Sequence, residues 1–170
     1  HAGKTIEEHT YDAYGRGLTS QVGGGQELLT FDYAGPNQTL VTDAAGGVVE
    51  YVSAMVAGTR KLIRINGPCA CTGSTEFTEW TWDQQTGHVI ATRTSLTDNP
   101  TVFNRNAQGD VVSIVDPLQR IVWRTYDGEG RMLTENTPDL ATRQWTHGPE
   151  GTLTTTDPLG RTTTFHYDGT

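Results

Sequence analysis

TYDGEGRMLTENTPDL, residues 125–140, contains the pattern that decides the fold. An aromatic residue and an aspartate are followed, after two spacers, by Gly130 and Arg131. Asp at the first position of a type I turn accepts hydrogen bonds from backbone N–H groups two or three residues on, and Gly at the far corner takes the positive φ that a Cβ would oppose. Such a turn reverses the chain into a hairpin with the twist that strands need. We therefore predict a strand end, a reversal and a new strand here.

The same box, an aromatic residue followed by Asp or Asn and then Gly, recurs along the chain. The boxes and the structural residues we assign to them are Tyr11, Asp12, Gly15 and Arg16; Phe31, Asp32 and Gly35; Trp82, Asp83 and Gly87; Tyr126, Asp127, Gly130 and Arg131; and Tyr167 with Asp168, which open a further box. Phe103-Asn104 is a looser copy, while Trp145 and Tyr51 fall in step but lack the acid. The aromatic positions 11, 31, 51, 82, 103, 126, 145 and 167 give a period of about 21 residues with one long step.

A second turn signal lies between the boxes. DPLQR begins at Asp116 and DPLGR at Asp157, which are 41 residues apart, or about two periods. In the second copy, Pro158 presets φ, Gly160 occupies the far corner and Arg161 follows it. Each unit of about 21 residues therefore carries two turns, and we expect two strands between them.

The stretches between turns read as strands. In IVWRTY, residues 121–126, alternate side chains point to opposite faces, and period two over six residues indicates a half-buried strand. The apolar run at 48–58 is ambiguous, but its β-branched start favours a strand. We find no amphipathic helix of 12 residues or more. We predict an all-β chain of repeated antiparallel β-hairpins, a single domain over 1–170 with an irregular unit or insertion at about 52–76.

Boxes of Tyr-Asp-x-x-Gly-Arg at this period, with Asp-Pro-Leu-Gly-Arg between them, resemble the Rhs/YD-repeat family. The clearest matches are YDAYGRGLTS from Tyr11, YDGEGRMLTE from Tyr126 and DPLGRTTTFHYDG from Asp157. The resemblance covers nearly all of the chain, and residues 52–76 match it least well. It implies an extended, curved strip of hairpins that closes into a β-shell. In bacterial Rhs toxins and the C component of ABC toxins this shell encloses a toxic domain, and in teneurins a similar shell supports cell-surface adhesion.

The resemblance implies a structural role, with no enzyme activity and no cofactor. It implies as partners other YD repeats of the same parent chain, an enclosed toxin domain, or identical copies that join edge to edge, because a strip this short leaves open strand edges. It also implies a secreted or cell-surface location reached by bacterial export. Family members cut themselves near an Asp-Pro-x-Gly-Leu motif, but Asp157-Pro158-Leu159-Gly160 is followed here by Arg161, so we interpret that motif as a turn.

Several boxes depart from the family pattern. The box of Tyr11 has an extra residue, Gly17, as a β-bulge would need. The box of Phe31 ends in Gly35-Pro36 instead of Gly-Arg. These departures affect the register of the repeats.

The cysteines leave three alternatives open. Cys69 and Cys71 are separated by one residue, so a bond between them in one chain would be strained. They are plain loop thiols, a disulfide within or between chains, or part of a metal site completed by other ligands.

Composition excludes other classes. The formal charge is -8, which repels phosphate backbones and argues against nucleic acid as a partner. No apolar run of about 18 residues predicts a membrane span, and we see no metal-ligand or nucleophile pattern. One alternative function is a carbohydrate- or cell-surface-binding adhesion module, since aromatic rings can stack on sugars. The other is a self-assembling extracellular filament subunit. We favour core packing for the tryptophans concerned, which are Trp80, Trp82, Trp123 and Trp145.

Overall fold

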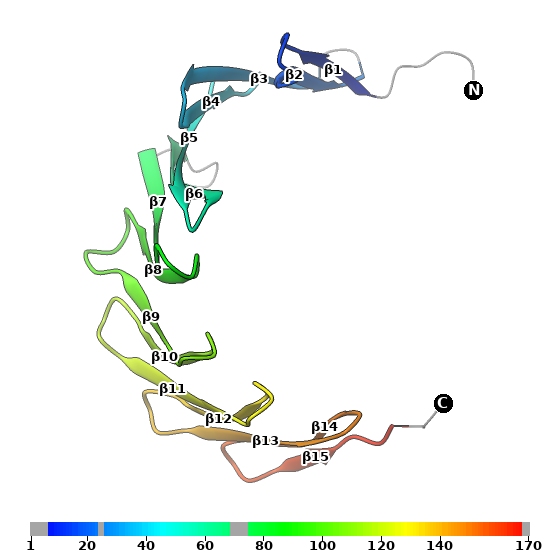
Figure 1. The fold of residues 1–170 in the computed structure, drawn as a ribbon, viewed down its shortest axis with the longest axis vertical. Coiled ribbons are helices and arrows are strands. Elements are labelled where there is room, and N and C mark those ends of the chain that lie inside the picture. Colours follow the sequence, from blue (N-terminus) through cyan, green and yellow to red (C-terminus); the bar gives the residue numbers. More distant parts are fainter. Residues whose placement is uncertain (1–6, 24–25, 69–74, 168–170) are drawn as a thin grey trace. The chain divides into compact units, whose positions relative to one another are not determined.

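The computed structural model describes residues 7–23, 26–68 and 75–167, and all regular structure within them is strand (Figure 1). Cys69, Cys71 and Asp168 lie outside the described residues. The strands are β1 Glu7–Tyr11, β2 Gly17–Val22, β3 Gln26–Gly35, β4 Gln38–Thr42, β5 Val48–Val56, β6 Thr59–Pro68, β7 Thr75–Trp82, β8 Val89–Thr94, β9 Thr101–Arg105, β10 Val111–Val115, β11 Ile121–Tyr126, β12 Met132–Asn136, β13 Thr142–Gly148, β14 Gly151–Thr156 and β15 Thr162–Thr164. No helix of the described part is long and apolar enough to span a membrane.

The chain divides into two compact units, His1–Leu96 and Thr97–Thr170. In the first unit, β1 to β8 pair one after another as antiparallel neighbours. In the second unit, β9 to β15 do the same. The prediction of repeated antiparallel hairpins is confirmed, and so is the prediction of a strand at the apolar run that became β5.

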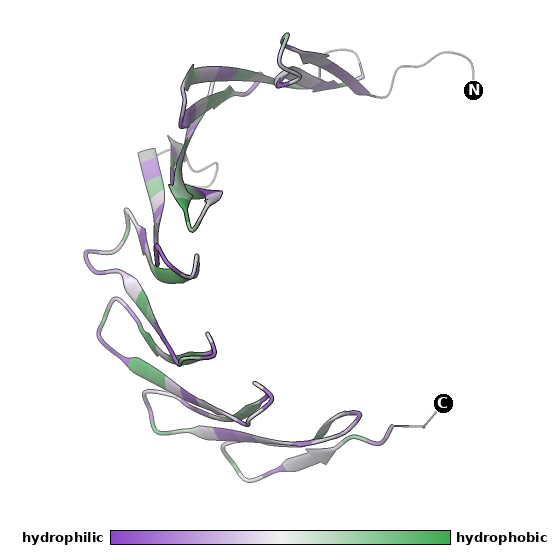
Figure 2. Cartoon of the chain, in the orientation of Figure 1, coloured by the Kyte–Doolittle hydropathy of each residue, from purple (hydrophilic) through white to green (hydrophobic). Residues whose placement is uncertain are grey.

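Each unit is a single layer of sheet, because substantial contacts join only strands that are neighbours in sequence. Among the described residues, Val56 and Ser113 alone are buried, at 1% and 2% exposure. The prediction that the tryptophans pack in a core is wrong for Trp123, which is 54% exposed. The physical reason is that no second layer covers the described strands, so even a large apolar side chain keeps one side in water. Hydrophobic and hydrophilic residues both occur along the strands (Figure 2).

The register of the ladders shifts in one class of hairpin. Shifts occur in β1–β2, β3–β4, β5–β6, β7–β8, β9–β10, β11–β12 and β13–β14. Of the ladders that join these hairpins, β2–β3 also shifts, whereas β4–β5, β6–β7, β10–β11, β12–β13 and β14–β15 stay in register. The register shifts beside Tyr11, but Gly17 pairs with Tyr11 and Leu18 is the residue left unpaired, so the prediction that Gly17 is the extra residue is wrong. A bulge bends the strand that carries it, so bending is concentrated in the hairpins.

Residues 52–68 of the segment that we expected to be irregular form regular structure. Val56 and Thr59 pair across a turn of Ala57 and Gly58, and β5 and β6 continue from there as a long hairpin. Gly58 has φ 74°, a conformation that glycine adopts without strain. The rest of that segment includes residues 69–74, which lie outside the description.

Candidate functional site

The box turn is the most regular feature of the chain, and Asp127 shows how it is built. The backbone N–H of Asp127 donates to the carbonyl of Arg131 at 2.9 Å, and the N–H of Gly130 donates back to the carbonyl of Asp127 at 3.2 Å. Asp127 Oδ1 accepts from the N–H groups of Glu129 and Arg131, each at 2.9 Å. Asp127 Oδ2 accepts from Arg131 Nε at 2.7 Å. One carboxylate therefore satisfies two backbone donors and one guanidinium, while Gly130 takes φ 78°.

The same turn closes three other hairpin connections. Each has the two backbone bonds, the two Oδ1 contacts and the Arg Nε contact of 2.6–2.7 Å described for Asp127. These turns begin at Asp12, Asp116 and Asp157 and end at Arg16, Arg120 and Arg161. The box and the DPLGR motif are therefore one structural element used at both ends of the strands. From the sequence alone we had taken them as two separate turn signals.

Variants of the turn keep the geometry with other side chains. Asn106 Oδ1 accepts from the backbone at the same two positions, and Asn106 Nδ2 donates to Asp110 Oδ2 at 3.0 Å in place of an Asp–Arg pair. Asp43 has the backbone contacts but is followed by Gly47 instead of Arg. Asp83 caps a turn one residue longer, which ends at His88.

These contacts keep the turn carboxylates ionised. The hydrogen bond from the Arg131 N–H, the guanidinium of that residue and the N–H of Glu129 lower the pKa of Asp127 to about 2. The backbone and side chain of the following arginine likewise lower the pKa values of Asp116 and Asp157. The pKa of Asp12 is also lowered, since its contacts with Arg16 outweigh the opposing effect of partial burial.

The box assigned to Phe31, Asp32 and Gly35 does not form this turn. Asp32 lies inside β3 and pairs with Leu40, while the chain reverses three residues later, between Gly35 and Gln38. The prediction of a turn aspartate at Asp32 is therefore wrong. The physical reason is that Pro36 sets the reversal at its own position, which leaves Asp32 within the ladder.

The aromatic residue of the box has its own role, which is to join consecutive hairpins. Tyr126 Oη donates to the carbonyl of Val111 at 2.8 Å, and Tyr167 Oη donates to the carbonyl of Thr152 at 2.9 Å. Each acceptor lies near the start of the second strand of the preceding hairpin. The hydroxyl thus satisfies a carbonyl that lies beyond the end of the ladder between the two hairpins.

Two other side chains make the equivalent contact at positions that sequence reasoning missed. Tyr33 Oη donates to the carbonyl of Gly17 at 2.9 Å, and His147 Nε2 lies 2.7 Å from the carbonyl oxygen of Met132. We had placed the boxes at Phe31 and Trp145, each two residues too early. All four contacts join residues 15 or 16 apart, a regularity that becomes visible only once the acceptor carbonyls are known.

A further periodic signal was missed in the strand that follows each turn. The residue left unpaired at the register shift is aliphatic in six hairpins, namely Leu18, Ile63, Ile90, Val112, Leu133 and Leu153. Three hairpins also pair threonine hydroxyls beside the shift at 2.7 Å, as Thr10–Thr19, Thr125–Thr134 and Thr146–Thr154. The repeat is thus Thr-aromatic-Asp-x-x-Gly-Arg-x-aliphatic-Thr in its fullest form.

One face of the first unit carries a run of polar contacts across β4 to β8. Gln38 Nε2 donates to Glu50 Oε1, and Asn66 Nδ2 donates to Glu50 Oε2 at 2.6 Å. Arg64 Nε donates to Asn66 Oδ1 at 2.5 Å. The hydrogen bonds from Asn66 and Gln38 lower the pKa of Glu50. These side chains are cross-strand neighbours, so the contacts from Gln38 to Arg64 tie β4, β5 and β6 together.

The run ends in a carboxylate between two arginines. Glu79 accepts from Arg64 NH1 through one oxygen and from Arg93 NH2, at 2.8 Å, through the other. The hydrogen bond from Arg93 and the charge of Arg64 lower the pKa of Glu79. Both guanidinium carbons lie over the Phe77 ring, at 4.3 and 5.0 Å from its centroid. One carboxylate is thus shared by two guanidinium groups.

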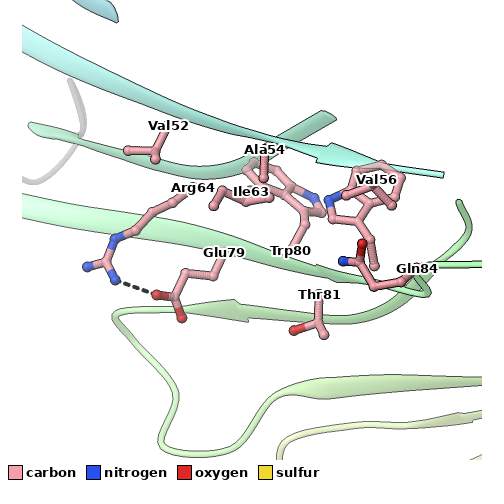
Figure 3. Close-up of a pocket in the computed structure, with 10 residues that line it drawn as sticks. Val52, Ala54, Val56, Ile63, Arg64, Glu79, Trp80, Thr81 and Gln84 are labelled. Atoms are coloured by element: carbon pink, nitrogen blue, oxygen red, sulfur yellow. Dashed lines mark hydrogen bonds and ion pairs between the residues drawn. The ribbon is translucent and has the colours of Figure 1, made fainter. Parts of the chain in front are cut away.

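A groove beside this carboxylate is lined by two tryptophans. Ala54 and Val56 of β5 line it as well, and in Figure 3 Trp80 lies near Ala54 while the Arg64–Glu79 pair lies at the other end of the groove. Trp82 Nε1 donates to the carbonyl of Leu62 at 2.9 Å, which fixes that ring against β6. The groove therefore combines apolar ring surface with charged groups. Within residues 7–23, 26–68 and 75–167, no group of three His, Cys, Asp or Glu side chains could hold a metal ion.

The fold and its turns define the class of the chain, an antiparallel β-hairpin repeat protein. No family model matches it, and no curated protein does.

Several solved structures match the chain. TcdB2-TccC3-TEV is 16% identical over 89% of this chain with a TM-score of 0.47, and TcdB2-TccC3-Cdc42 is 15% identical over 84% with a TM-score of 0.45. A Photorhabdus luminescens Tc holotoxin pore with a TccC3 variant is 15% identical over 93%, with a TM-score of 0.45. The chain spans about a tenth of the length of each matching chain.

Proposed function

We propose that the chain is a structural segment of a β-shell of the Rhs/YD kind, a wall that encloses or scaffolds other protein in a secreted toxin or cell-surface assembly. The observation that carries this proposal is the repeated element described above. The same capped turn recurs at four positions, and side chains such as Tyr126 and His147 join a hairpin to the one before at four junctions. Such a single-layer sheet suits a wall, because its stability comes from neighbouring hairpins and needs no second layer.

The chain acts as a container without catalysing a reaction. Its charged side chains are engaged in turns and cross-strand contacts, as Asp127 is with Arg131 and Glu79 is with Arg93. The protein that it encloses or scaffolds is a toxin domain or another component of the assembly.

Enclosure is tested by limited proteolysis of the chain expressed with its native flanking sequence. We expect an enclosed polypeptide to resist cleavage until the wall is opened by Tyr126→Ala, which removes one hairpin-joining contact. Tyr14→Ala is the matched control, because Tyr14 is 86% exposed at a turn and contacts the Arg16 guanidinium instead of another hairpin. Flanking polypeptide that is cleaved equally fast in the wild type and in both variants would contradict enclosure.

The open edges of β1 and β15 are the places where a partner strand can extend the wall. In the described part of the chain, β1 pairs only with β2 and β15 only with β14, so each has one side without a ladder. Open strand edges pair readily with other strands, and the partners we propose are further repeats or identical copies of the chain. We expect light scattering to show association that weakens with Thr163→Lys in β15. Thr155→Lys, at the paired position on β14, is the control. A concentration-independent monomer with intact sheet would contradict such joining.

Carbohydrate binding is the second candidate, and the tryptophan groove favours it. Ring surface from Trp80 and Trp82 beside the Glu79 carboxylate is the combination that stacks on and hydrogen-bonds to a sugar. A glycan array would then show binding that Trp80→Ala abolishes and Trp123→Ala, at an exposed tryptophan of the other unit, leaves unchanged. If the folded wild type binds no glycan, carbohydrate binding is contradicted, and the two rings serve only to pack against β5.

A further inference from the structure

The two rims of the second unit, where its turns lie, differ in chemistry. Alternate turns of an antiparallel meander lie at the same rim, and those of residues 116–120, 137–141 and 157–161 project together (Figure 1). Each of these three turns contains one proline and one leucine. We call the side chains of Leu118, Leu140 and Leu159 the leucine rim.

The leucine rim is unusually exposed. Its side chains are 72%, 88% and 78% accessible in chain order. The turns at the opposite rim place Gln108, Glu129 and Glu150 at their exposed positions instead. An apolar row on one rim and a polar row on the other, repeating with the same hairpin, marks the apolar row as an interaction surface.

Turn geometry does not require these leucines. Leu118 and Glu129 occupy the same position of the same turn, and each backbone N–H reaches its aspartate at 2.9 Å. Leu140 is less expected still, because it has φ 64° at a corner where glycine avoids strain. The turn itself therefore does not explain the leucines.

Charge at the leucine rim is largely neutralised within each turn. Asp116 pairs with Arg120 and Asp157 with Arg161, each at 2.6 Å. The middle turn adds one carboxylate, Asp139, which accepts a hydrogen bond from Thr137 Oγ1 at 2.5 Å. The chain as a whole carries a formal charge of -8, so two copies repel over most of their surface. A nearly neutral apolar rim is where two such copies can approach.

We propose that the leucine rim docks against the leucine rim of a second copy of this chain. Leucines on alternate turns are separated by two strand spacings, about 9.6 Å, and a second copy has the same spacing by construction. A two-fold arrangement then places each leucine of one copy between two leucines of the other. Because the contact is small, the association is weak and depends on concentration. This surface is separate from the strand edges of the proposed wall.

Photo-crosslinking locates the contact. With p-benzoylphenylalanine in place of Leu140, we expect a crosslinked dimer of the full chain. The same group in place of Glu150 on the opposite rim should give none. The Leu140 crosslink should survive Thr163→Lys, which blocks strand-edge pairing, so failure of the wall proposal and failure of this one are distinguishable. Crosslinks from position 150 alone, or only to other proteins, would overturn the proposal.

Sedimentation velocity over a concentration series measures how tightly two copies of the chain associate. Replacing Leu118, Leu140 and Leu159 together by Ser should weaken association by at least about tenfold. Replacing Gln108, Glu129 and Glu150 together by Ser should not weaken it. Circular dichroism confirms that both variants keep their sheet, and single Leu→Ser variants serve if the triple variant unfolds. A wild-type chain that stays monomeric, or association that is unchanged in the leucine variants, would overturn docking between copies.

Discussion

The hydroxyl of Tyr126 donates a hydrogen bond to the carbonyl oxygen of Val111, 2.8 Å away and fifteen residues earlier in the chain. The ladder between β10 and β11 ends at the pair of Ser113 and Trp123, so this contact lies beyond it. The side chain therefore extends the connection between two hairpins past the point where backbone pairing stops. The tyrosine of the box is explained by this bond and the aspartate by the turn that follows.

Removing that hydroxyl should loosen the second unit. We expect Tyr126→Phe to lower the free energy of unfolding by about 1 kcal/mol, because the Val111 carbonyl loses its partner while the ring stays in place. Chemical denaturation measures the change. Tyr14→Phe at an exposed turn position is the control, with an expected change near zero. Equal effects of the two substitutions would show that the hydrogen bond contributes nothing.

Acid should destabilise the chain through its turns. The pKa of Asp127 is about 2 in the folded chain against an ordinary value of 3.8, so the unfolded chain binds a proton more readily. The stabilisation from this carboxylate is present above pH 4 and is lost as the pH falls towards 2. Asp116 and Asp157 have pKa values shifted in the same direction.

Thermal unfolding measured from neutral pH down to pH 2 tests this dependence. We expect the midpoint to fall steeply below pH 4. Asp127→Asn should have a lower midpoint at neutral pH and a shallower fall, because one titrating group is gone. A variant with the same pH profile as the wild type would exclude Asp127 as a contributor.

The turn that begins at Asn106 suggests how a turn whose aspartate has been replaced by asparagine can be stabilised again. Asp157→Asn keeps an Oδ1 acceptor for the backbone but places Nδ2 against the guanidinium of Arg161, so we expect a lower melting temperature. Adding Arg161→Asp reproduces the side chains of Asn106 and Asp110, which bond at 3.0 Å. The double variant should therefore melt above the single one. A double variant that melts lower still would show that the two turns are not interchangeable.

The sequence predicted the strands and most turns because their signals are local. An aspartate that caps a turn, a proline at the next position and a glycine at the corner act within five residues, as at Asp157. The same local logic failed at Asp32, which has the right neighbours but lies in a strand because the reversal occurs after Gly35. Pro36 sets the later reversal, and the box pattern alone does not choose between the two.

The exposure of side chains was predicted less well, because it depends on what covers each face of the sheet. Alternation predicted that Trp123 and Val122 lie on opposite faces, yet it could not tell that Trp123 would remain 54% exposed. The roles of Tyr33 and His147 were missed for a related reason. Each bonds a carbonyl in the preceding hairpin, and that acceptor is identified only when the register of both hairpins is known.

The carboxylate of Glu79 should stabilise the first unit through both of its arginines. We expect Glu79→Gln to lower the free energy of unfolding by about 1 kcal/mol, because a neutral amide replaces the charge between Arg64 and Arg93. Glu129→Gln is the control, since its carboxylate is 73% exposed, and its expected change is below about 0.5 kcal/mol. Denaturant titration measures both. A Glu79 variant as stable as the control would mean that desolvation cancels the attraction.

The turns at 116–120 and 157–161 share one geometry. The cost of a positive φ at a residue with a Cβ can therefore be measured by removing it from one turn and introducing it in the other. Gln119 in DPLQR has φ 63°, whereas Gly160 in DPLGR has φ 79° at the same position. We expect Gln119→Gly to raise the free energy of unfolding by about 0.5–1 kcal/mol, because glycine adopts this conformation without a clash. Gly160→Gln should lower it by a similar amount, and nothing lies within 4 Å of a Cβ placed there, so crowding cannot explain a loss. Gln119→Ala, which keeps the Cβ, should leave stability close to the wild type when all three variants are unfolded in denaturant. If Gln119→Ala stabilises the chain as much as Gln119→Gly does, the gain comes from removing the glutamine side chain, and the backbone explanation is wrong.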